Sequence, residues 1–318
     1  MVHTLIIRGY LMDFSVITDS VISLFIIMLV GVYGTKKKII TPQANKAFID
    51  LLIQIALPFM ILSSFIFTYD DSIKSNVIKT FYYSIAAYII IMLVSYLLLL
   101  PVKKDKKIVL HFANVFTNTG YVGFPILNSI YGAEGVVYGS IFNMFFVIFV
   151  WTYGIILFKG KFDKDEFLSE VKKILLNPSI IAVFLGLIIM IFGIQLPNAL
   201  LFSIRSIGNI TGPLSMIIIG AILSEVKIKD YLIDWTLYYG VTTKLIFIPI
   251  IIYLISLLLG EPSKAINTVI IMSAMPASAM TSILAESFNR EKDYAAVVVS
   301  VTTLLSLITV TVLLRLIL

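Results

Sequence analysis

Long apolar runs recur from one end of the chain to the other, with short polar segments between them. Each run has about 20 residues, the length that an α-helix needs to cross a hydrocarbon core of about 30 Å. The pattern therefore predicts an all-α, polytopic membrane protein with ten membrane-spanning helices. We expect these helices at residues 14–34, 45–68, 77–100, 107–131, 134–158, 178–196, 201–224, 235–259, 264–288 and 294–317.

Composition agrees with a membrane protein and narrows the chemistry. Hydrophobic residues make up 59% of the 318 residues and charged residues 13%, which excludes a soluble globular domain. The sequence has no Cys and two His, His3 and His111, so it offers no disulfide, no thiolate ligand and no zinc-binding His cluster. We expect no metal and no cofactor. The sequence also lacks a phosphate-binding loop, so ATP should not drive the protein directly.

Basic residues flank the apolar runs, which makes them signals of membrane topology rather than of nucleic-acid binding. Loops after the odd-numbered spans hold 17 Lys or Arg residues. The opposite side holds six, namely Arg8, Lys74, Lys79, Arg205, Lys264 and Arg315. Because basic loops stay in the cytoplasm, both termini should lie outside the cytoplasmic membrane. The first span ends in GTKKK rather than at a small-residue cleavage site, so we expect it to remain a span.

The chain divides into two halves with the same number of spans. A cut in the longest polar loop leaves five spans in residues 1–160 and five in residues 178–318, joined by a cytoplasmic linker at 161–177. Both halves carry prolines in their second and fourth spans, namely Pro58 and Pro125, then Pro213 and Pro276. Because five is odd, the second half must cross the membrane in the opposite orientation. These features predict an inverted-topology repeat, in which the substrate site lies near the midplane on broken helices.

The fourth span contains the segment FTNTGYVGFPILNSIYG at residues 116–132, which is unusually rich in Asn, Thr and Gly. Pro125 removes a backbone donor and clashes with the preceding turn. Non-helical backbone inside a membrane is tolerated only beside a cavity or within protein. We therefore expect the helix to break before Pro125 and to restart there, since proline suits the first helical position. Thr119 and Gly123 would supply a hydroxyl group and a flexible backbone at the break.

The ninth span should break in the same way, and its second half should open with Pro276, Ala277 and Ser278. A single membrane proline is most often only a kink, but the matched pair favours a crossover of two broken helices. The two restarted N-termini would then point toward each other. Each carries about half a positive charge and several unpaired N–H groups, so their meeting point predicts a binding site for a carboxylate.

These motifs together resemble the auxin efflux carrier family of plants and its bacterial relatives, often labelled malate or malonate permeases. The similarity covers nearly the whole chain. It includes GVYGTKKKIITPQANKAFIDLLIQIALPFMILSSF, TNTGYVGFPILNSIYG, NPS at the sixth span, TGPLSMIIIGAIL, TKLIFIPI and AMPASAM.

The resemblance implies a fold and several roles. The fold would be a ten-helix transporter related to bile-acid sodium symporters and sodium/proton antiporters. Helices 1, 2, 6 and 7 would form a scaffold, able to dimerise, and helices 3–5 and 8–10 a moving transport domain. An Asn before the fourth-span proline contacts the substrate carboxylate in the family, and Asn118 matches it. The plant pattern has a second Asn where this chain has Ser179, which favours small dicarboxylates over a bulky aromatic acid.

Charged residues inside the spans are further candidates. Lys244 lies about 15 Å from the cytoplasmic edge of the eighth span, too deep to reach the interface easily. It could pair with the substrate carboxylate, take the place of a coupling sodium ion, or bind backbone carbonyls. Asp50 and Glu286 are coupling candidates, although both lie near span ends and could be solvated carboxylates. His111 lies near a cytoplasmic span end and needs no special role.

The remaining polar and aromatic residues of the spans have ordinary explanations. Hydrogen bonds between helices account at least as well as ligand contact for four polar residues, Asn143, Asn209, Ser215 and Asn267. Trp151, Trp235 and Tyr238 are expected to be interface anchors.

The sequence thus predicts a secondary active transporter for a small organic anion, a mono- or dicarboxylate, working in the lipid bilayer by alternating access. A sodium-coupled or proton-coupled symporter or antiporter is an alternative, and an ion channel a weaker one. An intramembrane enzyme would need a nucleophile and a base at midplane depth, and no such pair is visible.

Overall fold

A computed structural model describes residues 14–66, 71–160, 174–225, 233–258 and 263–317, together with residues 168, 171, 172 and 231. Residues 1–13 and most of the predicted linker at 161–177 lie outside the described residues. In the described ranges the regular structure is helical, and the β-type contact is an isolated antiparallel bridge between Thr117 and Ala277. The predicted all-α class is therefore confirmed.

The first half of the chain forms helices and π-helical turns in a fixed order. These are α2 (Phe14–Lys36), α3 (Pro42–Leu51), η2 (Leu52–Ala56), α4 (Leu57–Ser64), α5 (Asp71–Leu98), α6 (Lys104–Val115), η3 (Thr119–Gly123), α7 (Phe124–Phe149), η4 (Val150–Gly154) and α8 (Ile155–Lys159).

The second half of the chain also consists of α-helices and a π-helical turn in the described ranges. Its elements are α10 (Pro178–Phe192), α11 (Asn198–Gly208), α12 (Thr211–Glu225), α13 (Trp235–Thr242), η6 (Thr243–Phe247), α14 (Ile248–Leu258), α15 (Lys264–Ser273), α16 (Met280–Ser287) and α17 (Lys292–Ile317).

Several helices are long and apolar enough to cross a membrane. In the described ranges there are five, namely Pro42–Ser64, Ser72–Leu98, Thr119–Lys159, Asn198–Ser224 and Trp235–Leu258. A sixth results if Lys292–Ser306 and Ile308–Arg315, which meet at 45°, count as one span. The protein is therefore helical with several membrane-crossing segments.

Breaks in the backbone explain part of the difference from the ten spans predicted, and α10, with 15 residues, is also too short to be counted. Breaks divide the predicted spans 107–131 and 264–288, so that α6, α15 and α16 are each too short to cross alone. Gly132, with φ 59° and ψ −145°, interrupts the helical geometry inside Thr119–Lys159, where spans 107–131 and 134–158 were expected to meet. The division into ten spans and two inverted repeats stays a prediction.

Prolines explain three of the π-helical turns. The turns η2, η3 and η6 each end two residues before a proline, at Pro58, Pro125 and Pro249. Proline cannot donate the ordinary i→i−4 hydrogen bond, and its ring clashes with the carbonyl group of the turn before it. A wider π turn makes room for the ring while the helix continues, and such turns are frequent at functional sites.

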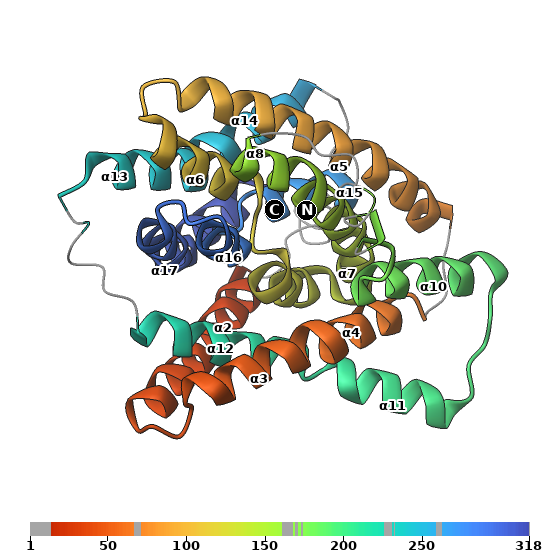
Figure 1. The fold of residues 1–318 in the computed structure, drawn as a ribbon. Coiled ribbons are helices and arrows are strands. Elements are labelled where there is room, and N and C mark those ends of the chain that lie inside the picture. Colours follow the sequence, from red (N-terminus) through yellow and green to blue (C-terminus); the bar gives the residue numbers. More distant parts are fainter. Residues whose placement is uncertain are drawn as a thin grey trace, which may run out of the picture.

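Packing divides the helices into two groups, which Figure 1 shows. Toward the lower side of the view, α2 packs along α12, and α4 packs against α10 and α11. Toward the upper side, α5 packs against α6 and α15, and α14 against α15. The helix α7 contacts members of both groups, including α4, α5, α10 and α15.

The contact between α2 and α12 depends on two glycines. A Cβ atom built on Gly31 would lie 2.2 Å from the carbonyl oxygen of Ile217, and one built on Gly220 would lie 2.0 Å from that of Met28. No side chain fits at these distances, so the two backbones touch directly. Small residues that allow such an approach are the usual means of helix association in membranes.

Candidate functional site

The two predicted breaks occur, and they cross each other. The helix α6 ends at Val115 and α15 ends at Ser273. Beyond these ends the two extended segments form hydrogen bonds with each other. Asn118 N–H donates to the carbonyl of Pro276 at 2.7 Å, and Ser278 N–H donates to the carbonyl of Phe116 at 2.9 Å. The freed backbone groups of each break are thus satisfied by the other, as a membrane interior requires.

The restart points differ from the prediction. The fourth-span segment resumes at Thr119, not at Pro125, because the Asn118 side chain accepts a hydrogen bond from Tyr121 N–H at 3.1 Å. The ninth-span segment resumes at Met280, not at Pro276, and the Ser278 hydroxyl accepts from Met280 N–H at 3.2 Å. Asn118 is the N-cap residue of the fourth-span restart, and Asn is a strong N-cap residue. The N-cap position of α16 is Ala279, so Ser278 binds the first helical N–H from one residue earlier.

A cavity of about 540 Å³ opens where these two helix starts meet. It is lined by residues 118–121 of the fourth-span restart, by residues 278–280 of the ninth-span restart, and by residues of α3, α7, α10, α12 and α17. Most of the lining is apolar, and none of the described residues that line it is charged. The apolar part comes from Ile49, Ile53, Leu57, Phe146, Val147, Val150, Ile222, Met280, Ile283, Ala296 and Val299.

Uncharged polar side chains are part of the cavity wall. The Thr119 hydroxyl donates to the Asn143 side-chain oxygen at 2.6 Å, which fixes both residues on the wall. Ser300 also lines the cavity, and its buried hydroxyl group has no hydrogen-bond partner among the described residues. Asn177 caps α10 through Ser179 N–H at 3.0 Å and brings the start of a third helix to the cavity.

The predicted substrate-binding residues fall into two groups. Asn118, Thr119, Ser179 and Ser278 line the cavity. Gly123, Pro125, Pro276, Ala277 and Lys244 do not line it.

The residues off the cavity wall hold the crossover in shape. A Cβ on Gly123 would lie 2.6 Å from the Met272 sulfur, so the glycine allows the two broken segments to touch. Ala277 N–H donates to the Thr302 hydroxyl at 3.2 Å and fastens the ninth-span break to α17.

Lys244 lies behind the crossover and is 1% exposed. Its Nζ donates to the carbonyl oxygens of Asn114 at 3.0 Å and of Ser273 at 3.4 Å. These carbonyls belong to the last turns of α6 and α15, where helix dipoles concentrate negative charge. Of the three roles considered for Lys244, this geometry matches the binding of carbonyl groups at a position where a cation is favourable.

The coupling candidates lie elsewhere. Asp50 and Glu286 are exposed side chains and neither lines the cavity. His111 is buried, with its ring nitrogens 2.8 Å from the Ser95 hydroxyl and 2.6 Å from the Tyr153 hydroxyl. Hydrogen bonding between helices accounts for this histidine.

Comparison with known proteins decides the family. A family model described as "Membrane transport protein" matches residues 16–314. The chain belongs to this family of membrane transporters. The assignment confirms the resemblance to auxin efflux carriers.

Two archaeal transporters are similar to this one. The uncharacterized transporter MJ1031 of Methanocaldococcus jannaschii is 24% identical over 308 residues, which cover 92% of this chain and 96% of the relative. An uncharacterized transporter of Methanothermobacter thermautotrophicus is 25% identical over 199 residues, which cover 62% of this chain and 63% of the relative.

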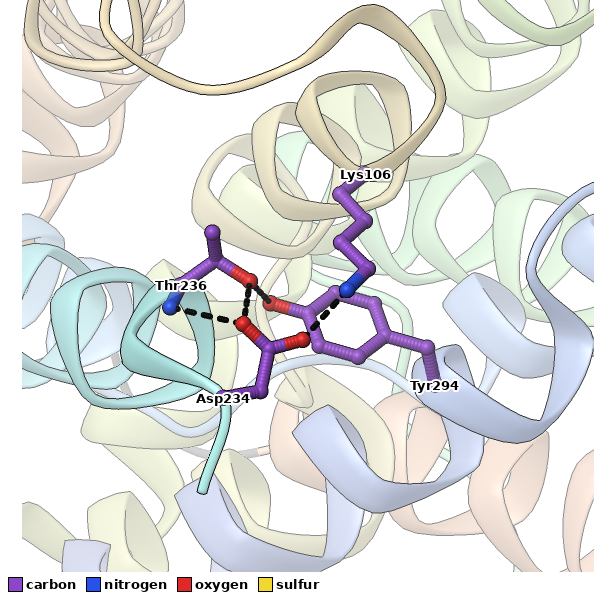
Figure 2. Close-up of polar contacts among 4 residues, drawn as sticks. All are labelled: Lys106, Asp234, Thr236 and Tyr294. Carbon is purple, nitrogen blue, oxygen red and sulfur yellow. Dashed lines mark hydrogen bonds and ion pairs between the residues drawn. The ribbon is translucent and has the colours of Figure 1, made fainter. Parts of the chain in front are cut away.

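A polar cluster ties three helices of the transporter together, as Figure 2 shows. Lys106 of α6 forms an ion pair with Asp234, whose side chain also caps α13 by accepting from Thr236 N–H at 3.0 Å. The Thr236 hydroxyl donates to Asp234 at 2.7 Å and lies 2.9 Å from the hydroxyl of Tyr294 in α17. The single hydroxyl proton of Thr236 is thus donated to Asp234. The Tyr294 hydroxyl must therefore be the donor in its contact with Thr236.

The charge state of Asp234 follows from these contacts. Burial alone would raise the pKa of its carboxyl group, but hydrogen bonds from Lys106 and Thr236 and the charge of Lys106 outweigh burial and hold the pKa below its ordinary value. Asp234 therefore stays ionised at neutral pH and keeps α6, α13 and α17 joined.

The sequence missed several residues of the cavity wall in the transporter. Asn143 was explained by bonding between helices, yet it also lines the cavity. Trp151, expected to be an interface anchor, also lines the cavity. Gln54 was not singled out, although a lone amide in the run LLIQIALP was a usable signal. Nothing in the sequence separates Tyr121 from an ordinary core aromatic residue.

Proposed function

We propose that the protein is a secondary transporter that moves a small organic anion, a mono- or dicarboxylate, across the cytoplasmic membrane by alternating access. One observation carries this proposal: two broken helices restart at a single cavity, with Asn118 and Ser278 at their starts. The positive ends of both helix dipoles and the polar side chains of Asn118 and Ser278 attract a carboxylate group, and no charged lining residue is needed to hold it.

The chemistry of the wall favours a monocarboxylate with an apolar body over a dicarboxylate. The two helix starts can stabilise one carboxylate group. A second carboxylate would enter a cavity whose described wall holds no cationic side chain and is largely apolar, with residues such as Ile53, Phe146 and Val299, and a desolvated charge without a cation is costly. The expectation of small dicarboxylates, which came from Ser179, is thereby weakened.

The helix groups support a two-part transporter. The group α2, α3, α4, α10, α11 and α12 corresponds to the proposed scaffold, and the group around α5, α6, α13, α14, α15, α16 and α17 to the proposed transport domain. Both would derive from inverted repeats at 1–160 and 178–318. Movement of the second group against the first would carry the cavity from one side of the membrane to the other.

The position of Lys244 is relevant to whether transport is coupled to an ion. Its ammonium group lies at the ends of α6 and α15, where a sodium ion would otherwise find carbonyl oxygens. This position supports a carrier that needs no sodium ion at the crossover, either a uniporter or one linked to protons through the substrate. Sodium or proton coupling through Asp50 or Glu286 remains the alternative function.

The cellular setting completes the proposal. The excess of basic residues in loops after odd-numbered spans supports both termini outside the cytoplasmic membrane. The transporter would act without an enzymatic step, without nucleic acid, and as a homodimer through the scaffold.

Uptake and counterflow in proteoliposomes test the site. Labelled phenylpyruvate, a monocarboxylate with an aromatic body, is compared with labelled succinate. Asn118→Asp keeps the helix cap, because Asp caps as well as Asn, but places a negative charge where the carboxylate should bind. We expect phenylpyruvate uptake to fall at least about tenfold, which corresponds to about 1.4 kcal/mol of lost binding.

Asn267→Asp is the matched control, since Asn267 contacts Tyr131 and does not line the cavity. If Asn118→Asp transports like the parent, the site assignment is wrong. Preference for succinate would contradict the apolar-body specificity. Saturable flux supports a carrier, whereas single-channel current steps would support a channel.

A further inference from the structure

A second cavity, of about 420 Å³, lies beyond the start of α7. Residues of α2, α4, α7, α11 and α12 line it. The fourth-span segment reaches both cavities, with Asn118 on the wall of the first and Pro125 and Asn128 on the wall of the second. The helix α4 does the same, with Leu57 at the first cavity and Met60 at the second.

The wall of this second cavity is more polar than that of the first. It carries the hydroxyl groups of Ser63, Ser64 and Ser129 and the amide groups of Asn128 and Asn209. Among the described residues that line it, Arg205 is the one with a charge, and none is acidic. The three hydroxyl groups donate to backbone carbonyl groups of their own helices. The wall therefore offers an anion the N–H donors of Arg205 and of the two amide groups.

Arg205 is exposed, and its Nη2 donates to the carbonyl oxygen of Ile66 at 3.3 Å. This bond holds the guanidinium group against the end of α4. A guanidinium group has five N–H donors, so most of them can still reach an anion in the cavity. Planar groups of this kind match the two oxygens of a carboxylate.

The sequence places Arg205 on the side opposite to the lysine-rich loops. It belongs to the six basic residues of that side, whereas 17 lie in the loops expected in the cytoplasm. The first cavity includes residues near the cytoplasmic ends of their spans, such as Ser179 at the start of α10 and Ser282 in α16.

We propose that the second cavity is an anion vestibule on the outer side of the membrane, with Arg205 as the group that attracts the substrate carboxylate. This inference rests on the proposed function, since it assigns a second binding place on the path of the same substrate. The vestibule and the first cavity are two ends of one route, separated by the start of α7.

The absence of native Cys allows a direct test of sidedness. Single cysteines are introduced by Asn128→Cys in the vestibule and by Ser282→Cys in the first cavity. A membrane-impermeant thiol reagent is added to right-side-out and inverted membrane vesicles. We expect Asn128→Cys to react faster in right-side-out vesicles than in inverted ones, and phenylpyruvate to slow the reaction. Ser282→Cys, in the cavity that alternates between the two sides, should react in both preparations. Faster reaction of Asn128→Cys in inverted vesicles would overturn the vestibule.

A charge substitution tests the role of Arg205. Arg205→Gln should raise the half-saturating concentration of phenylpyruvate offered from the outer side by about threefold, the size expected for an exposed charge contact. The effect should weaken at high salt and be absent from the inner side. Lys79→Gln, on the same side but outside the cavity, should behave like the parent.

Two further comparisons distinguish the substrate from a lipid headgroup as the anion that Arg205 binds. Vesicles of phosphatidylcholine alone are compared with vesicles containing phosphatidylglycerol. An Arg205→Gln effect seen only with phosphatidylglycerol would identify a lipid headgroup as the anion and overturn the proposal. Equal behaviour of Arg205→Gln and Lys79→Gln in a transporting preparation would overturn it too. A parent that transports neither acid contradicts the proposed function, while the labelling test still decides on which side the cavity opens.

Discussion

Asn118 and Lys244 lie at opposite kinds of helix end in the same crossover. Asn118 is at a helix start, and Lys244 is at two helix C-termini. Asn118 caps the start of the fourth-span restart, and Lys244 binds carbonyl groups at the ends of α6 and α15. The positive dipole ends therefore remain available to a ligand, while the negative ends are neutralised by a residue of the protein. At the residue scale, this separation of charge is what suits the cavity to an anion.

Lys244→Met tests whether the lysine acts on the fold or on the substrate. Methionine has a similar length but cannot donate, so the carbonyl groups of Asn114 and Ser273 lose a charged donor. We expect the free energy of unfolding to fall by about 1–3 kcal/mol, with an unchanged half-saturating phenylpyruvate concentration in the protein that remains folded. Thermal unfolding in detergent, together with uptake, measures both. A raised half-saturating concentration at unchanged stability would instead indicate contact with the substrate.

At the element scale, glycine and capping residues decide where helices touch and begin. The helix pair α2 and α12 packs backbone to backbone through Gly31 and Gly220. The fourth-span restart follows its cap residue Asn118 rather than the proline, and the ninth-span restart follows Ala279. Proline instead determines where the π turns lie, because the ring requires a wider turn before it.

Gly220→Ala should separate α2 from α12. The new methyl group would lie 2.0 Å from the Met28 carbonyl oxygen, and overpacking of this kind costs about 1–3 kcal/mol. Gly212→Ala in the same helix is the control, because its methyl group would meet nothing within 4 Å. We expect it to leave stability unchanged or to raise it by up to about 1 kcal/mol. Thermal unfolding of both variants in detergent provides the comparison, and equal loss in both would contradict the close approach.

At the scale of the whole molecule, polar contacts join helices that should move together. The ion pair of Lys106 with Asp234 and the hydrogen bond of Thr236 with Tyr294 connect α6, α13 and α17. Arg290 and Asp105 add a contact at 3.3 Å between the start of α6 and the turn before α17. These contacts lie within one helix group and leave the other group free of them, which supports movement as a unit.

The depressed pKa of Asp234 sets a pH dependence. A carboxyl group whose pKa is lower in the folded protein stabilises it above the unfolded pKa of about 3.9, and this contribution is lost as the pH falls toward the folded value. Asp234→Asn should therefore lower stability at neutral pH, by at most about 1 kcal/mol for a partly exposed pair. The difference from the parent should vanish in strong acid.

Thermal unfolding in detergent over a pH series measures this difference. Glu286→Gln, which removes an exposed carboxylate, should unfold like the parent at every pH. A difference between Asp234→Asn and the parent that grows in acid would contradict the role given to the ion pair.

Three features follow from the amino-acid sequence, namely the membrane class, the family and the two breaks. Each depends on local chemistry: the length of apolar runs, the motif around Asn118, and prolines flanked by small polar residues. Which residues share the cavity depends on how the helices pack. Asn143 and Trp151 come to its wall through packing between helices, and the partners of Lys244 are carbonyl groups more than 25 residues away in sequence. Local patterns show where a helix must break, whereas the neighbours of a side chain depend on how distant helices pack.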